Sequence, residues 1–331
     1  MPLIPSCSEN SVASCMGRTL DQIFKMSSLS ALAQMSADLV ALAEHSLPKV
    51  FTVYPLHRGR KFAHGSGWAY GPDLVVTNNH VADGTFSELL IRSRVYGELR
   101  AELVGTDVDT DLAVLQVDGL NMNPFQIRDT PPRVGELCIT LGTPLDETHQ
   151  DSVSLGVVSG TGRQIPRTET RKFEEVVQID ALINQGNSGG PLVDVESRVI
   201  GVNFLGRLLQ EGVPSGINFA ISSEVVRDVV PELIEHGRMR RATIGASITV
   251  RTRKVEHGFE PCIQVVRTAS SDSPLKEGDY IMAVDGLRVS RRYDLMRILN
   301  GKVIGRDVEL EVERAGKFMR IDVRANARPD G

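Results

Sequence analysis

The sequence predicts a mainly β protein, built as a β-sandwich or a pair of β-barrels and followed by a smaller β-rich module. About ten short runs rich in Val, Ile, Leu and Thr, separated by Gly, Asp, Asn and Pro, follow Pro48. No long stretch of helical periodicity separates these runs. The chain has 331 residues, 41% hydrophobic and 24% charged, which is an ordinary globular composition with room for two or three domains.

One helix is predicted ahead of the β runs. Apolar residues recur at positions 29, 32, 35, 39 and 42, which is a helical period, and Pro48 follows shortly after. Residues 1–27 are rich in serine and show no regular pattern, so residues 1–45 are expected to form an N-terminal extension. Because the helix carries no lysine or arginine, docking on a barrel or a neighbouring subunit is favoured over binding to an anionic membrane.

Residues 46–237 form the larger predicted domain. Ser222 or Ser223 is expected to cap a helix that continues through Pro231 and ends at Gly237. The strands expected before this helix include residues 73–78, 112–117, 137–141, 152–159, 176–179, 191–193, 199–203 and 216–221.

Residues 242–328 form the second predicted domain, with strands at 243–250, 263–266, 280–284 and 308–313 and a helix near 292–299. The charged stretch from Arg238 to Arg241 before it is expected to be a solvated linker. An alternative is that Arg238, Arg240 and Arg241 contact the carboxylate of a bound peptide.

Composition excludes several classes of function. The formal net charge of −5 disfavours a nucleic-acid partner. Four cysteines are too few for a disulfide framework in a chain of this length. They include no C-x-x-C pair that would indicate a thiolate zinc site, and no H-E-x-x-H motif is present, so no metal is expected. No apolar run approaches the ~20 residues that span a bilayer. The first residues lack the features of a secretory signal, which leaves open a cytoplasmic protein or a targeting segment that is absent from the sequence.

Three segments together predict acyl-transfer chemistry. His80 follows a predicted strand, Asp111 precedes another, and Ser188 lies in the glycine-rich turn Gly186-Asn187-Ser188-Gly189-Gly190. A hydroxyl nucleophile needs a base to take its proton and a carboxylate to orient that base, and these residues occur in the order His, Asp, Ser that chymotrypsin uses. The other histidines lie in no comparable setting: His45, His57, His64, His149, His236 and His257.

The same turn is expected to form the oxyanion hole at Gly186, Asn187 and Ser188. Gly186 permits backbone angles that other residues avoid, so the N–H groups of Gly186 and Ser188 can point at one spot.

As a set, the motifs resemble the HtrA/DegP serine proteases, in which a chymotrypsin/trypsin-like double β-barrel is followed by a PDZ domain. They occur in order and cover roughly Gly65 to the C-terminus: Thr77-Asn78-Asn79-His80-Val81, Thr110-Asp111-Leu112-Ala113, Leu141-Gly142-Thr143-Pro144, and residues 154–162, 178–192 and 217–221. The resemblance implies an endopeptidase that cleaves unfolded or damaged proteins in protein quality control, works without a cofactor, and assembles as a homotrimer. It suggests the periplasm or cell envelope as the compartment.

The resemblance also implies two binding sites. Ile183 and Phe219 would line the primary specificity pocket with apolar surface for small or medium aliphatic residues; for Phe219, ordinary core packing is equally consistent with the sequence. A preference for Lys or Arg is disfavoured because no acidic residue precedes the turn, and a buried cation needs a partner. In the PDZ domain, Thr243, Ile244, Gly245 and Ala246 match the loop that binds a peptide C-terminal carboxylate.

The sequence departs from the family pattern in two places. Residues 54–64 form only a short link where some members carry a long regulatory loop, which argues against cage assemblies, and a single PDZ domain is present. Two rival functions stay open: a protease-like barrel that binds unfolded chains without turnover, and an esterase or acyltransferase that uses the same triad. The complete triad disfavours the first, and the PDZ domain disfavours the second.

Overall fold

The computed structural model describes residues 28–61, 63–83, 85, 88–143, 150–166, 172–208, 214–255 and 258–328. It divides into two compact units, residues 1–47 and 48–331. The first contains the predicted helix as α2 (Ser28–Ser46), which continues by four residues past the last predicted apolar position, 42, while residues 1–27 lie outside the described residues. Within the described ranges, no helix has the length and hydropathy that a membrane crossing requires.

The chain passes from the first unit to the second within a short 3-10 helix, η1 (Leu47–Lys49). The second unit continues with a six-stranded antiparallel barrel that β1 closes by pairing with β5. Its interior is apolar and includes Phe51, Val75, Ile91 and Leu115. A two-residue strand, β2 (Arg60–Lys61), pairs with the end of β1, so part of the expected link at 54–64 is strand. The barrel order is β1 (Val50–His57), β3 (Gly65–Ala69), β4 (Leu74–Asn78), β7 (Leu112–Gln116), β6 (Gly97–Asp107) and β5 (Glu88–Ser93).

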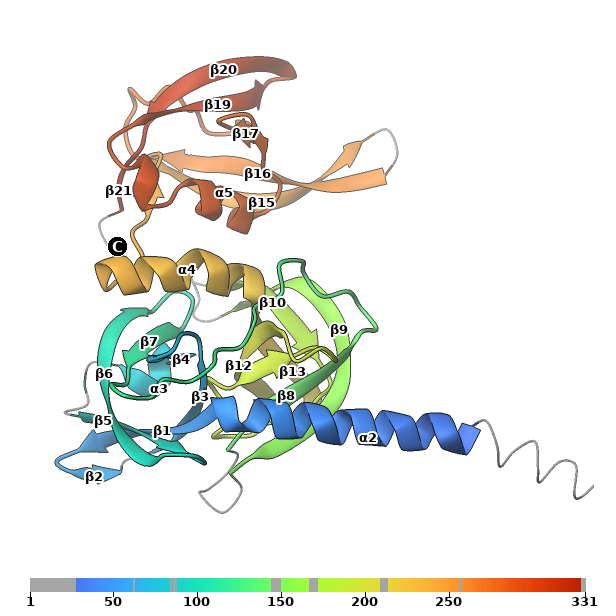
Figure 1. Cartoon of the computed structure of the whole chain (residues 1–331). Coiled ribbons are helices and arrows are strands. Elements are labelled where there is room, and N and C mark those ends of the chain that lie inside the picture. Colours follow the sequence, from blue (N-terminus) through green and yellow to red (C-terminus); the bar gives the residue numbers. More distant parts are fainter. Residues whose placement is uncertain are drawn as a thin grey trace, which may run out of the picture. The chain divides into compact units, whose positions relative to one another are not determined.

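A second closed barrel follows and packs its own core around Ile139, Val177, Leu192 and Ile200. Helix α4 (Ser223–His236) leaves it and contacts strands of both barrels (Figure 1). Its ends are those predicted, since Ser222 caps the start and Gly237, with φ 70°, ends it. The barrel order is β10 (Lys172–Ile179), β13 (Pro214–Ser222), β12 (Val199–Leu208), β11 (Pro191–Val193), β8 (Leu137–Gly142) and β9 (Ser152–Pro166).

The C-terminal module is a twisted antiparallel sheet with one helix and a separate core that includes Ile263, Ile281, Leu295 and Val312. Its elements are β14 (Ala242–Thr243), β15 (Ala246–Val255), β16 (Gly258–Thr268), β17 (Tyr280–Val284), β18 (Leu287–Arg288), α5 (Arg292–Ile298), η4 (Gly301–Val303), β19 (Asp307–Arg314), β20 (Lys317–Arg324) and β21 (Asn326–Ala327).

The predicted fold class is confirmed: two closed six-stranded barrels precede a PDZ-like β domain. The expectation of a solvated linker at Arg238–Arg241 is wrong for Arg241, whereas Arg238 is exposed as expected. Arg241 is buried and bonds Asp107 of β6 through both guanidinium nitrogens, at 2.7 and 2.6 Å, while Arg240 bonds Glu232. A buried carboxylate needs a paired cation, so this stretch anchors the C-terminal domain to the first barrel.

Candidate active site

His80 and Asp111 meet at one end of the first barrel. The register of β4 on β7 pairs Asn78 with Leu112, so the residues that follow Asn78 lie beside those that precede Leu112. His80 lies on the single-turn helix α3 (Asn79–Ala82), and its Nδ1 is 2.6 Å from Oδ2 of Asp111. Because the buried carboxylate accepts, Nδ1 carries the proton and Nε2 is left as an acceptor on an imidazole that is 49% exposed.

The backbone of Asp111 is held in an unusual conformation. Its φ is +61°, in the left-handed region that Asp tolerates better than most residues. The carbonyl of Asp111 accepts from the N–H of Asn79 (3.0 Å) and from Nδ2 of Asn78 (2.9 Å), and Oδ1 accepts from the N–H of His80 (3.0 Å). These bonds fix both the carboxylate and the imidazole that it orients.

Asp107 anchors the loop that leads to Asp111. One of its oxygens accepts from the N–H and the hydroxyl of Thr110, and both oxygens accept from Arg241. Burial alone would raise the pKa of Asp107, but the bonds from Arg241 and Thr110 outweigh it and hold the pKa below the ordinary value. The loop is therefore fixed by a charged group that remains ionised at neutral pH.

Ser188 lies in the nucleophile turn, which we define as residues 186–190. Gly186 has φ +100°, and a Cβ on it would lie 2.2 Å from the carbonyl oxygen of Thr143. Gly189 has φ +86°, and its Cβ would lie 2.1 Å from the carbonyl oxygen of Ser66 and 2.4 Å from Oγ1 of Thr77. Only glycine fits at either position, which explains the glycine-rich pattern of the turn.

Two N–H groups of the turn are free. The N–H of Asn187 donates to the carbonyl of Asn184 (3.0 Å), just before the turn, whereas the N–H groups of Gly186 and Ser188 donate to no acceptor in the described part of the chain. A pair of unpaired backbone donors beside a serine is the arrangement that an oxyanion requires.

The two halves of the site meet along β3. The N–H of Ser66 donates to the carbonyl of Ser188 (2.7 Å), and its hydroxyl donates to the carbonyl of Gly186 (2.7 Å). Gly65 fills the narrow space between them, since a Cβ on it would lie 2.6 Å from a methyl of Val81 and 3.0 Å from the Ser188 carbonyl. Val81 follows His80, so β3 lies between the backbone of Ser188 and the short helix that carries His80.

In this structure the hydroxyl of Ser188 bonds the carbonyl of Phe204 on β12 at 3.4 Å. The Phe204 ring packs edge-to-face on Phe173 of β10, with centroids 4.7 Å apart. The serine is thus oriented by a strand of its own barrel.

The predicted pocket residues lie on facing segments. Ile183 and Phe219 are both buried, and Ile183 belongs to the core of the second barrel. Asn218 joins the segments, since its Nδ2 donates to the carbonyl of Ala181 (2.9 Å). Their role as pocket walls stays a prediction.

The predicted carboxylate loop borders a cavity of about 140 Å³ in the C-terminal domain. Thr243, Ile244 and Ala246 line it, whereas Gly245, with φ +67°, forms the bend and donates its N–H to the Thr243 hydroxyl (3.1 Å). The other lining residues are mostly apolar or basic: Ile248, Leu295, Met296, Leu299, Arg241, Ala242, Arg292 and Arg328.

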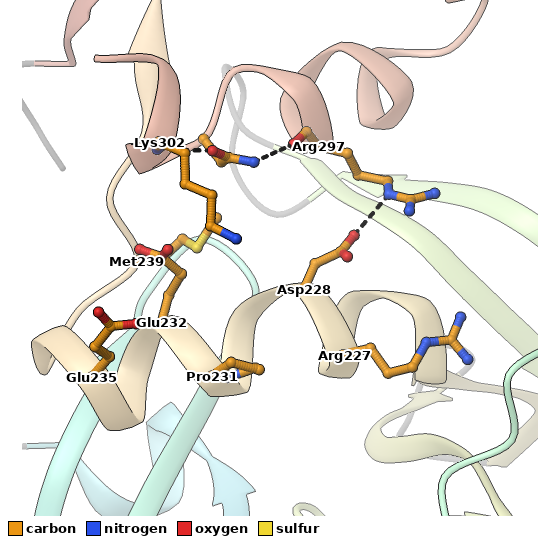
Figure 2. A pocket seen from close by; sticks show the side chains of 9 residues that line it. Arg227, Asp228, Pro231, Glu232, Glu235, Met239, Arg297 and Lys302 are labelled. Atoms are coloured by element: carbon orange, nitrogen blue, oxygen red, sulfur yellow. Dashed lines mark hydrogen bonds and ion pairs between the residues drawn. The ribbon is translucent and has the colours of Figure 1, made fainter. Parts of the chain in front are cut away.

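A second cavity, of about 250 Å³, lies between α4 and the C-terminal domain. Figure 2 shows Asp228 of α4 directed at Arg297 of α5, with Nε 2.9 Å from its carboxylate. The hydroxyl of Tyr293 donates to the same carboxylate at 2.7 Å, and burial together with Asp228 raises the pKa of Tyr293, so this hydroxyl stays protonated. Acidic and basic side chains alternate around this cavity, which favours a contact between helices over a site for one ion.

Other chemistries find little support in the described part of the chain. No group of three or more His, Cys, Asp or Glu that could hold a metal ion occurs there. Cys138 and Cys262 are free and buried, and burial raises the pKa of the Cys138 thiol to about 12, which keeps it from acting as a thiolate nucleophile.

Sequence reasoning missed three residues around the triad: Ser66, Arg241 and His64. Ser66 lies in Gly65-Ser66-Gly67, whose small residues were a signal that backbones approach closely there. Arg241 pairs with a residue 134 positions away, and no local pattern reports such a pair. His64 was set aside with the other histidines, although its Nε2 lies 3.1 Å from the Thr143 carbonyl beside Gly186.

Comparison with known families gives two matches. The trypsin-like peptidase domain family matches residues 65–202, and the PDZ domain family matches residues 242–324. Among curated relatives, the probable periplasmic serine endoprotease DegP-like of Pseudomonas savastanoi pv. phaseolicola is 34% identical over 276 residues, which is 80% of this chain and 56% of the relative. A protein with the same description from Halomonas elongata is 34% identical over 284 residues, 83% of this chain and 58% of the relative.

This chain therefore spans a little more than half the length of these curated relatives. Among solved structures, an HtrA-type protease AlgW with tripeptide superimposes with a TM-score of 0.74 at 28% identity, covering 87% of this chain and 97% of that chain. The serine endoprotease from Yersinia pestis gives a TM-score of 0.65 at 26% identity, covering 87% and 97%. The two barrels and the PDZ-like domain thus occur together, in this order, in solved proteases.

Proposed function

We propose that this chain, which belongs to the HtrA/DegP family of serine proteases, hydrolyses peptide bonds in unfolded polypeptides through Ser188. The observation that carries the proposal is the nucleophile turn, where the free N–H groups of Gly186 and Ser188 lie beside a serine that β3 holds near His80. His80 is the general base in this proposal, and Asp111 orients it.

The proposed reaction uses each of these groups in turn. The hydroxyl oxygen of Ser188 attacks the carbonyl carbon of the scissile bond, and its proton passes to Nε2 of His80. Asp111 stabilises the imidazolium, while the N–H groups of Gly186 and Ser188 bind the oxyanion. The C–N bond then breaks as the amine takes the proton from Nε2, leaving an acyl-enzyme. Water, deprotonated by His80, attacks the ester carbonyl, the bond to Ser188 breaks, and the serine recovers its proton.

The proposed substrates are polypeptides with a small or medium aliphatic residue before the scissile bond. Ile183 and Phe219 supply uncharged apolar walls on two segments that Asn218 ties together. A lysine or arginine side chain in such a pocket would leave its charge without a partner. We further propose that the cavity beside Thr243–Ala246 binds peptide C-termini, since basic and apolar side chains line it together.

Assembly and compartment are proposed from the relatives. Homologues described as periplasmic support the periplasm as the compartment, and family membership supports a homotrimer that acts in protein quality control. Light scattering of the purified chain measures the mass directly; a monomer of 36.2 kDa at micromolar concentration would contradict the trimer.

The proposed function is tested with Ser188→Ala, which removes only the hydroxyl. We expect the wild-type chain to cleave β-casein and to be labelled by a fluorophosphonate, and the variant to do neither while its thermal melt is unchanged. Residual cleavage by the variant would reject Ser188 as nucleophile. Absence of cleavage by both proteins, with or without a peptide that ends in an apolar residue, would favour a binding protein without turnover.

A further inference from the structure

We propose that His64 is a positioning residue for the nucleophile turn, and that it keeps the N–H of Gly186 available to the oxyanion. The inference rests on the proposed function of Ser188. His64 lies directly before β3 of the first barrel, whereas the turn belongs to the second barrel, so the side chain crosses the boundary between the barrels.

The first observation is the hydrogen bond from His64. Its Nε2 is 3.1 Å from the carbonyl oxygen of Thr143. Since a carbonyl can only accept, Nε2 carries a proton. No other group among the described residues donates to this carbonyl. The N–H of Thr143 donates to Ser66 (3.0 Å) and its hydroxyl bonds Thr52 (2.8 Å), so Thr143 itself is fixed.

The second observation is the position of the imidazole against Gly186. A Cβ on Gly186 would lie 2.2 Å from the Thr143 carbonyl oxygen, 2.6 Å from Nε2 of His64 and 3.2 Å from its Cδ2. One edge of the ring therefore lies against the turn. Tyr54 of β1 lies beside the imidazole, with ring centroids 6.4 Å apart, and limits the movement of the ring.

These two observations place the Thr143 carbonyl and the His64 ring against Gly186, whose N–H donates to no acceptor among the described residues. Buried carbonyl and N–H groups are rarely left unpaired, because each unmade hydrogen bond costs free energy. If the Thr143 carbonyl lost its donor, the nearby N–H of Gly186 would be available to replace it. That bond would turn the Gln185–Gly186 peptide away from the site and remove one of the two oxyanion donors. Because His64 already satisfies the carbonyl, it removes the driving force for this exchange.

The test compares two substitutions that separate the ring from its N–H. His64→Phe keeps the ring volume and the contact with Tyr54 but removes the donor, whereas His64→Gln places an amide N–H near the position of Nε2. We expect kcat of His64→Phe to fall about tenfold with KM within about twofold, since a donor used mainly in the transition state affects kcat. The affinity for a peptide aldehyde should fall by a similar factor. His64→Gln should return kcat to within about threefold of wild type.

Three results would overturn the inference while leaving the proposed function intact. These are wild-type kcat in His64→Phe, a rise in KM alone, and a His64→Gln variant as slow as His64→Phe. His57→Ala, at the exposed end of β1, is the matched control and should retain wild-type kcat. If instead Ser188→Ala remained as active as wild type, the proposed function would fail first and the role of His64 with it.

Discussion

The two segments that supply the site are stabilised in different ways. The loop from Asp107 to Asp111, in the first barrel, depends on charge: its buried carboxylates bond Arg241 and His80. The nucleophile turn, in the second barrel, depends on neutral bonds from Ser66 and on two glycines whose missing side chains leave room for backbone oxygens. One segment is held by ionised groups and the other by close backbone packing.

This difference indicates which changes each segment tolerates. The acidic loop should respond to loss of charge, either by substitution or by protonation, because an unpaired charge in the interior is costly. The nucleophile turn should respond to a single added methyl group, because carbonyl oxygens lie within about 2 Å of the Cβ positions. Four predictions test this contrast, from the largest expected effect to the smallest.

Asp111→Asn should have the largest effect. Asn tolerates the φ of +61° and keeps the size of the side chain, so the fold should survive. The amide cannot accept both the N–H and the Nδ1–H of His80, so the imidazole loses its orientation and its neighbouring charge. We expect kcat to fall about 10⁴-fold, as in other Ser-His-Asp sites, with little change in melting temperature. If kcat measured by steady-state cleavage fell less than tenfold, the charge of Asp111 would not be the main stabilising feature of this loop.

Gly186→Ala should have the second-largest effect on activity. We expect kcat to fall by about 10²–10³-fold, because the displaced turn loses an oxyanion donor. The control is Gly119→Ala. Gly119 has a similar positive φ, +76°, but nothing lies within 4 Å of its Cβ position. That control should lose about 1 kcal/mol of stability and no activity. If both variants behaved alike in kcat and in urea unfolding, backbone strain and not crowding would explain the glycine.

The triad and the oxyanion turn could be predicted from the sequence because each lies in a local motif. His80 follows the strand 74–78, Asp111 precedes the strand 112–116, and Ser188 is flanked by glycines that few structural turns need. The ends of helix α4 could be predicted from local signals as well, since Ser222 caps its start and Gly237 ends it. Short-range signals therefore located the groups that do the chemistry.

The groups that hold the triad in place could not be found in this way. Ser66 bonds a residue 120 positions away, and Arg241 bonds one 134 positions away. A run of arginines between two domains looks like a solvated linker until the fold places a buried carboxylate beside one of them. His64 has the same difficulty, because its partner Thr143 is 79 positions away and belongs to the other barrel.

Arg241→Met should destabilise the chain without removing any group of the triad. The substitution leaves Asp107 buried and unpaired, which typically costs about 3–5 kcal/mol. The control Arg324→Met breaks the exposed pair with Asp307 (3.4 Å) and should change stability by less than about 1 kcal/mol. Urea unfolding measures both. Equal losses would contradict the view that the acidic loop is held by a buried charge.

The smallest effect is expected from Glu136, an acidic residue of the second barrel outside the nucleophile turn. Hydrogen bonds from Arg128 lower its pKa from 4.5 to about 2. Because the folded pKa is the lower one, this pair stabilises the fold above about pH 4.5 and loses that contribution as the pH falls toward 2. Glu136→Gln should therefore cost about 1 kcal/mol at pH 7, after allowance for solvent screening, and should reduce the dependence of stability on pH in this window.

Stability and activity should separate in this variant. The nucleophile turn carries no ionised side chain, so kcat of Glu136→Gln at pH 7 should equal that of wild type, and only the urea midpoint measured from pH 5 to pH 2.5 should differ. A matching loss of kcat would mean that a charge pair of the second barrel supports the turn, and the contrast between a charged loop and a neutral turn would then be wrong.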